Sequence, residues 1–265
     1  MVAKGTTMWG CAVAVWFFLV GVGDAAHPRT TAPKKILFIG NSMTYVGDLP
    51  KQVARLAAEH NFGAVVCDME APGGVTLKQH WESGKAQKMI QTGNYDAVVI
   101  QGQSTESLDD LPSFKTYGIK FAEEASKYHA TPYLFSVWST CSPFACNAES
   151  LAQAQTSIDG DYADVAKATG AVIVPVGWAW AAYRTAHPSP IGVLTSDNAH
   201  PNNMGAYLNA AVFFESLFDK SSIGSKVVTG VSEAAAKEMQ TIAHAVVSKM
   251  KVTPNEKIGN AEYRK

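Results

Sequence analysis

From about residue 35 onward, the chain alternates short, continuous apolar runs with longer amphipathic stretches. Such apolar runs are typical of parallel strands that are covered on both faces, and here they predict strands at residues 35–39, 64–67, 97–100, 133–137 and 171–176. The amphipathic stretches predict helices at residues 49–60, 77–91, 112–129, 148–169, 201–218 and 231–250. Because crossovers between parallel strands are right-handed, we expect an α/β fold, a three-layer α/β/α sandwich with its ligand crevice at the carboxyl ends of the strands.

The first 26 residues stand apart from this pattern and have the features of an export signal. Lys4 supplies a positive start, residues 8–20 form an apolar run, and small residues follow at 23–26. The alternative is a membrane anchor, but the run is shorter than the roughly 20 apolar residues that a spanning helix needs. We therefore expect a signal peptide at 1–26, a linker at 27–34, one folded domain at 35–250 and a polar tail at 251–265, in a secreted or periplasmic protein.

Export changes the interpretation of the cysteines. Cys141 and Cys146 flank a proline-containing stretch, and in an oxidising compartment this spacing predicts a disulfide that closes a small loop. Cys67 falls in a predicted strand and is expected to be a buried free thiol. No cysteine or histidine pair has the spacing of a metal site, so we expect neither a metal nor another cofactor.

Overall composition narrows the classes of partner. The chain has 22 Lys and Arg against 23 Asp and Glu, a formal net charge of −1, and 47% hydrophobic residues. A near-zero charge argues against a protein that binds nucleic acid by neutralising phosphates, and the low charged fraction argues against disorder. A small, uncharged ligand fits this balance better.

Two polar motifs lie where the sheet should bind its ligand. Ser42 follows the first strand and Gly40-Asn41, a turn that can present a nucleophile, although a serine there could also cap a helix. Asp197 and His200 stand three residues apart, just before the helix that Pro201 opens. His200 could act as general base toward Ser42 while Asp197 orients the imidazole, or the segment could be a helix cap with an exposed histidine.

Together, Gly40-Asn41-Ser42 and Asp197-x-x-His200 resemble the motifs of the GDSL/SGNH hydrolase superfamily, whose block order matches the chain beyond its signal. The resemblance implies a five-stranded, mainly parallel, flavodoxin-like sheet. It also implies a catalytic triad in which Ser42 is the nucleophile, His200 the base and Asp197 the orienting acid. The backbone N–H groups of Ser42 and Gly74 would form the oxyanion hole, with Gly73 as the alternative to Gly74.

The third block departs from the family pattern. Where many relatives have G-x-N-D, this chain has Gln101-Gly102-Gln103-Ser104, which resembles the Q-G-E-S type of block in sialate and xylan O-acetylesterases. An amide on a longer side chain could replace the missing asparagine as an oxyanion donor. Gln101 is the first candidate and Gln103 the second.

The substrate is indicated by aromatic residues that follow the late strands. Trp138 and Trp178 could stack on sugar rings or acyl groups, and Asn41 is a third candidate for substrate contact; filling the core is the alternative role for the tryptophans. We expect a serine esterase that hydrolyses short-chain esters, acetyl above all, on a carbohydrate. The alternatives are an acyltransferase, lipase or thioesterase of the same superfamily, or a catalytically inactive carbohydrate-binding protein.

Overall fold

The computed structural model describes residues 31–141, 146–187, 189, 192–226 and 230–252. The predicted signal peptide at 1–26 lies outside this part, as do residues 27–30 of the linker and residues 253–265 of the polar tail. The described helices include none that is both long enough and apolar enough to cross a membrane.

A parallel sheet forms the centre of the molecule. In the described part of the chain its order is β2-β1-β3-β4-β5, the flavodoxin-like order. Every neighbouring pair is parallel, and Ile36 to Ile39 of β1 are fully buried. The strands are β1 (Lys35–Ile39), β2 (Val66–Glu70), β3 (Ala97–Ile100), β4 (Thr131–Phe135) and β5 (Val172–Val174).

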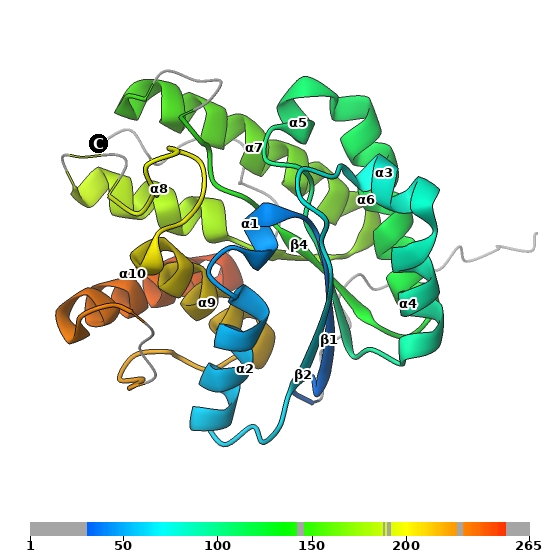
Figure 1. Ribbon diagram of the computed structural model, residues 1–265, viewed down its shortest axis with the longest axis horizontal. Helices are drawn as coiled ribbons and strands as arrows, with labels where there is room; N and C mark the ends of the chain where they lie inside the picture. The colour runs from blue at the N-terminus through cyan, green and yellow to red at the C-terminus, as the bar shows by residue number, and fades with distance from the viewer. Residues whose placement is uncertain (1–30, 142–145, 188, 190–191, 227–229, 253–265) are drawn as a thin grey trace, which may run out of the picture.

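Helices cover both faces, which confirms the predicted three-layer sandwich (Figure 1). Helices α2 (Leu49–Glu59), α9 (Asn203–Phe218) and α10 (Glu233–Val252) pack together on one face, and α8 (Val176–Ala186) packs against α9 and α10. The other face is covered by α3 (Leu77–Ser83), α4 (Lys85–Gly93), α6 (Leu111–Lys127) and α7 (Ala148–Thr169). Two one-turn helices, α1 (Ser42–Tyr45) and α5 (Glu106–Asp109), follow the carboxyl ends of β1 and β3.

Most predicted elements are present, and the differences have local causes. The helix predicted at 77–91 is divided at Gly84, whose φ of 70° is left-handed and ends α3. The second strand begins two residues later and ends three residues later than predicted. The cause is that β2 is an edge strand whose paired register, from Lys35↔Val66 to Ile39↔Glu70, includes polar residues. The fifth strand ends at Val174, and Val176 instead begins α8.

Candidate active site

The turn after β1 presents Ser42 as the first residue of α1. The cap of this helix is Asn41, whose Oδ1 accepts a hydrogen bond from the Met43 N–H at 3.0 Å. The alternative reading of Ser42 as the capping residue is therefore wrong. Ser42 is half-buried and lies at the carboxyl end of a central strand, where sheets of this order bind ligands.

A glycine loop lies beside this turn and supplies free donors. Asn41 Nδ2 donates to the Val75 carbonyl at 3.2 Å, and Gly40 N donates to the Glu70 carbonyl at 3.1 Å, so the turn is tied to both sides of the Gly73-Gly74 loop. Gly74 is exposed and has a φ of 72°. Among the described residues, none accepts a hydrogen bond from the N–H of Ser42 or of Gly74. Both groups are thus available to an oxyanion.

The Asp197 and His200 side chains form a hydrogen-bonded pair. His200 Nδ1 lies 2.6 Å from Asp197 Oδ2. Because a carboxylate only accepts, Nδ1 donates to Asp197, so that the lone pair of the neutral tautomer lies on Nε2. This is the tautomer that a general base requires.

Asp197 is itself fixed by a local network. Its Oδ1 accepts from Thr195 Oγ1 at 2.6 Å and from the backbone N–H groups of Ala199 and His200, each at 2.9 Å. The hydrogen bond from the Thr195 hydroxyl, followed by those from His200 and Ala199, holds the pKa of Asp197 well below its usual range. The carboxylate therefore stays charged beside the imidazole. Thr195 was not singled out in the sequence, although its place two residues before Asp197 is a typical position for such a contact.

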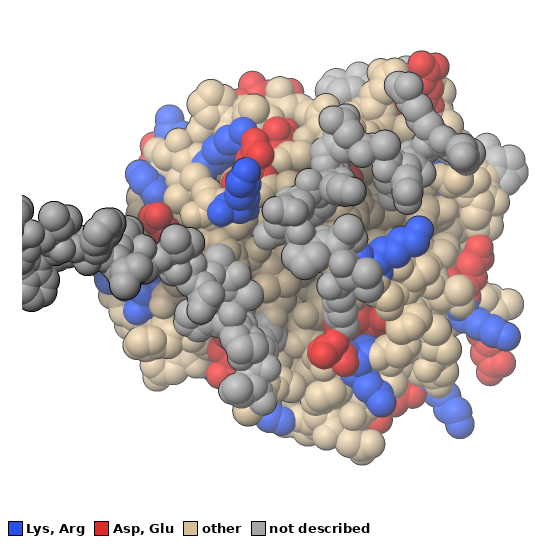
Figure 2. Space-filling view, turned by 180° about the vertical axis from the view of Figure 1, so that it is seen from behind, with Lys and Arg blue, Asp and Glu red and all other residues tan. Residues whose placement is uncertain are grey.

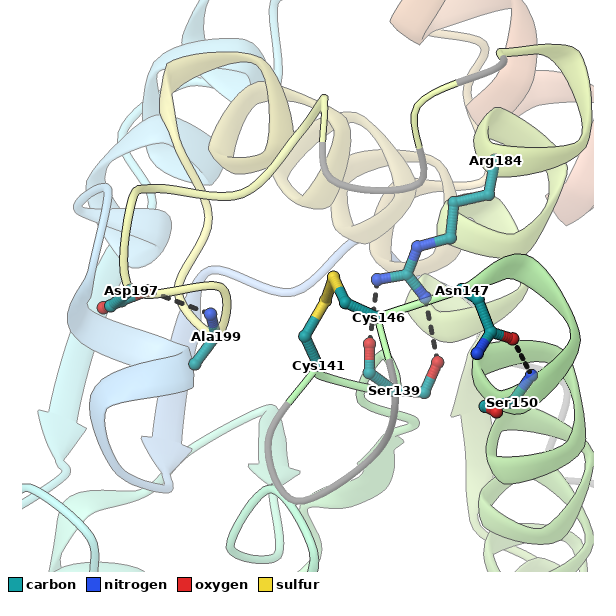
Figure 3. Close-up of a disulfide and its surroundings, with 8 residues drawn as sticks. All are labelled: Ser139, Cys141, Cys146, Asn147, Ser150, Arg184, Asp197 and Ala199. Atoms are coloured by element: carbon teal, nitrogen blue, oxygen red, sulfur yellow. Dashed lines mark hydrogen bonds between the residues drawn. A yellow bond between two sulfur atoms is a disulfide. The ribbon is translucent and has the colours of Figure 1, made fainter.

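The loop that carries the pair rests on the segment after β4. Trp138 Nε1 donates to the Ala199 carbonyl at 3.0 Å, and the Cys141 N–H donates to the Asn198 carbonyl at 3.1 Å. The predicted disulfide joins Cys141 to Cys146, and Figure 3 shows it between the Asp197 loop and Arg184 of α8. Arg184 in turn donates to the Ser139 carbonyl and hydroxyl. The disulfide thus constrains the segment that contacts the Asp197 loop through the Cys141 N–H.

Packing between α1 and α9 brings the two motifs to the same end of the sheet. Gly47, just after α1, lies so close to the first turn of α9 that an added Cβ would be 2.4 Å from the Ala206 Cβ. Helix α9 begins at Asn203, three residues after His200, and Asn202 caps it by accepting from Met204 N and Gly205 N. Figure 1 shows α1 beside the loop that leads into α9.

The candidate substrate residues have less suitable positions. Trp138 is fully buried and stacks on Trp180 at 4.3 Å between ring centroids, so it lies beneath the Asp197 loop rather than in the crevice. Trp178 is half-buried on α8, where its side chain hydrogen-bonds to the buried Asp159. Asn41 is 1% exposed and is used within the turn. For Trp138 and Asn41, burial and the internal hydrogen bonds argue against the predicted contact with substrate.

The two glutamines of the third block differ in whether an amide hydrogen is left to bind a ligand. Gln101 is fully buried, and its Nε2 donates to Asn41 Oδ1 at 3.0 Å and to the Gly102 carbonyl. Both amide hydrogens are therefore used inside the protein, and this corrects the expectation that Gln101 is the first oxyanion donor. Gln103 is half-buried, and its Nε2 donates to Ser104 Oγ at 3.0 Å, which leaves one amide hydrogen for another partner.

Other groups that could bind a metal or act as a nucleophile lie outside this arrangement. Within the described residues there is no cluster of three or more His, Cys, Asp or Glu side chains that could hold a metal ion. Cys67 is a free, partly buried thiol whose pKa burial raises to about 12, so it is a poor nucleophile.

Figure 2 shows how charged side chains are distributed on one face of the molecule. On this face, Lys and Arg are interspersed with Asp and Glu, and the visible part of it has no large patch of positive charge that could bind an anionic polymer.

Comparison with known proteins identifies the architecture. No protein-family model and no curated protein sequence matches the chain. A DUF4886 family protein from Bacteroides uniformis is similar in structure, with a TM-score of 0.65, 19% identity, and coverage of 84% of this chain and 96% of that one. A catalytic mutant of an acetylxylan esterase from Geobacillus stearothermophilus gives a TM-score of 0.56 at 16% identity, covering 69% of this chain and 94% of that one.

A third similar structure carries the superfamily name. A protein from Slackia heliotrinireducens that is assigned to the SGNH hydrolases matches with a TM-score of 0.59 and 22% identity, over 69% of this chain and 97% of that one. At such low identities the likeness speaks for the fold, and the motifs at the carboxyl ends of the strands agree with it. The chain has the fold of the SGNH, or GDSL, hydrolase superfamily.

Proposed function

We propose that the protein is a serine esterase in which Ser42, His200 and Asp197 act as a catalytic triad. The observation that carries this proposal is the 2.6 Å contact between His200 Nδ1 and Asp197 Oδ2, which leaves Nε2 as the basic nitrogen at the end of the sheet where Ser42 begins α1. The proton-donating Nδ1 and the low pKa of Asp197 suit a base that must become positively charged during the reaction.

The reaction takes place in two halves. Ser42 Oγ attacks the ester carbonyl carbon while His200 Nε2 accepts the hydroxyl proton, and the imidazolium then protonates the departing alcohol. Water attacks the resulting acyl-enzyme, again losing a proton to His200, which returns it to Ser42 Oγ as the acid leaves. The free N–H groups of Ser42 and Gly74 are the proposed donors to the negative oxygen of both tetrahedral intermediates. The spare amide hydrogen of Gln103 is the candidate third donor.

The proposed substrate is a short-chain ester, acetyl above all, on a carbohydrate. The likeness to an acetylxylan esterase supports this class, and so does the near-zero net charge of the chain, which favours a neutral ligand. We further propose that the protein works outside the cytoplasm. The apolar N-terminal run and the disulfide between Cys141 and Cys146 support that location.

Hydrolysis of an aryl acetate by the full chain tests the proposed activity. We expect turnover by the wild type, and a loss of about 10⁴-fold or more in kcat for Ser42→Ala. Ser126→Ala, at an exposed position on α6, is the matched control and should retain full activity. Equal rates for wild type and Ser42→Ala would refute the esterase mechanism.

A substrate panel then separates the proposal from its alternatives. Release of acetate from acetylated oligosaccharides should exceed hydrolysis of long-chain esters and of acyl thioesters. Preference for long chains would indicate a lipase or thioesterase, and transfer to added sugar in place of water would indicate an acyltransferase. The missing block-three asparagine and the internal use of the Gln101 amide favour one further alternative, a carbohydrate-binding protein without turnover. That alternative predicts sugar binding with no acetate release.

A further inference from the structure

The peptide unit that joins Gly40 to Asn41, one unit ahead of the peptide that enters Ser42, is held from both sides by buried side chains. The carbonyl of Gly40 accepts a hydrogen bond from His80 Nε2 at 2.7 Å, and the N–H of Asn41 donates to Gln101 Oε1 at 2.9 Å. His80 is 1% exposed and Gln101 is fully buried. His80 belongs to α3 and Gln101 follows β3, so two separate elements fix the same Gly40–Asn41 peptide plane.

The protonation of His80 follows from its partner. A carbonyl oxygen only accepts, so Nε2 must carry the proton in this contact. Desolvation by burial lowers the pKa of His80, which favours the neutral ring. The imidazole therefore acts as a fixed N–H donor and is not a second base.

Gln101 extends this hold to both sides of Ser42. Its Oε1 also accepts from Thr44 Oγ1 at 2.8 Å, and its Nε2 donates to the Asn41 side chain that caps α1. These contacts leave no space for a side chain at position 40, because an added Cβ on Gly40 would lie 2.4 Å from both Gln101 Oε1 and Thr44 Oγ1. One glutamine side chain thus contacts the residue before Ser42 and a residue two positions after it.

We propose that Gln101 and His80 are positioning residues that orient the Gly40–Asn41 peptide, and through it the Oγ and N–H of Ser42. The next peptide carries the Ser42 N–H, and Asn41 between the two peptides is held through its own side chain by Val75, Met43 and Gln101. Together these contacts limit the directions that the Ser42 Oγ and N–H can take. In the third block, Gln101 thus differs in role from the asparagine of the family pattern: its side chain holds the turn that carries Ser42 and does not donate to the oxyanion. The inference rests on the proposed function of Ser42.

The test compares variants that remove or retain each contact. Gln101→Met and His80→Leu keep approximate size but remove the hydrogen bonds, and each should lower kcat for an aryl acetate by about 10- to 100-fold with KM changed less than about 3-fold, the effect of misplacing a reacting group. His80→Gln keeps an N–H donor at a similar reach and should recover most of the activity. The double variant Gln101→Met with His80→Leu should lose little more kcat than the less active of the two single variants, because both residues hold one peptide.

A buried glutamine far from the site controls for lost stability. Gln240 on α10 is 3% exposed, accepts from Gly224 N, and donates to Tyr207 Oη and the Ser225 carbonyl. Gln240→Met should lower the melting temperature about as much as Gln101→Met while kcat stays within about 2-fold of the wild type. Equal losses of kcat in these two variants, or a change confined to KM, would overturn the positioning role. An active wild type with unaffected Gln101→Met and His80→Leu would overturn this inference alone, whereas an inactive wild type would overturn the proposed function and this inference with it.

Discussion

The contact between Trp138 and the Ala199 carbonyl offers a direct way to disturb the base without touching it. Trp138→Phe removes the indole N–H that donates at 3.0 Å to Ala199, the residue next to His200, and reduces the stacking on Trp180. The Ala199 carbonyl would lose its donor from beneath the loop. We expect the loop to shift and the imidazole to lose its alignment.

The size of the effect follows from the two lost contacts. The lost hydrogen bond to this part-buried carbonyl costs about 1 kcal/mol of unfolding free energy. The weakened ring pair adds roughly 1 kcal/mol. The total loss should therefore be about 2 kcal/mol, measured by denaturant unfolding followed by circular dichroism. In the same variant kcat should fall about 10-fold, because a small misplacement of a catalytic group is enough for such a loss.

Trp180→Phe is the matched control. Trp180 is equally buried, takes part in the same stacked pair, and donates to Asn209 Oδ1 at 2.7 Å within α9, away from the His200 loop. Its replacement should cost a similar free energy of unfolding while kcat stays within about 2-fold of the wild type. If both variants lose kcat in the same proportion, Trp138 only stabilises the core, and its proposed support of the base is refuted.

Three further changes have defined outcomes. Burial raises the pKa of Asp159 from 3.8 to about 7, so the folded protein binds this proton more tightly than the unfolded chain does. The resulting contribution to the unfolding free energy is complete below about pH 4. It falls by up to about 1.4 kcal/mol per pH unit as the pH rises toward 7. Asp159→Asn should flatten that part of the unfolding free-energy profile, and an unchanged slope would contradict the buried-proton account. Replacing Cys141 and Cys146 together by serine should cost about 2 kcal/mol, as expected for so short a loop, and should raise amide hydrogen exchange at residues 195–200; unchanged exchange there would show that the disulfide does not support the loop. Gly205→Ala should destabilise the protein despite the better helix propensity of alanine, because its Cβ would lie 2.4 Å from the Val193 carbonyl; a higher melting temperature would contradict this.

The sequence was sufficient for the architecture because parallel strands buried on both faces give continuous apolar runs. The helix predicted at 148–169 has the bounds of α7, where Asn147 caps the start and Gly170 the end. The second strand was displaced because an edge strand tolerates the polar Asp68 and Glu70, which interrupt the apolar run. The end of the fifth strand was misplaced because Val172 to Val176 are apolar both in β5 and in the first turn of α8.

The site was predictable to a lesser degree, since burial decides what a polar side chain can do. Residue types and spacing singled out Ser42, Asp197 and His200, but they could not show that Thr195 fixes Asp197. Gln101 had the correct chemistry for an oxyanion donor, yet tertiary packing directs its amide to Asn41 and Gly102. Trp138 was correctly placed after β4, but its indole turns under the loop instead of outward.

Covalent labelling with a fluorophosphonate tests the central claim most directly, because only an activated serine reacts at an appreciable rate. Intact mass and peptide analysis of the wild type should show one phosphonyl adduct, on the peptide that contains Ser42. Ser42→Ala should gain none, and His200→Ala should react far more slowly because it lacks the base that the Asp197 contact orients. An unlabelled but folded wild type, or an adduct that persists in Ser42→Ala, would contradict the account.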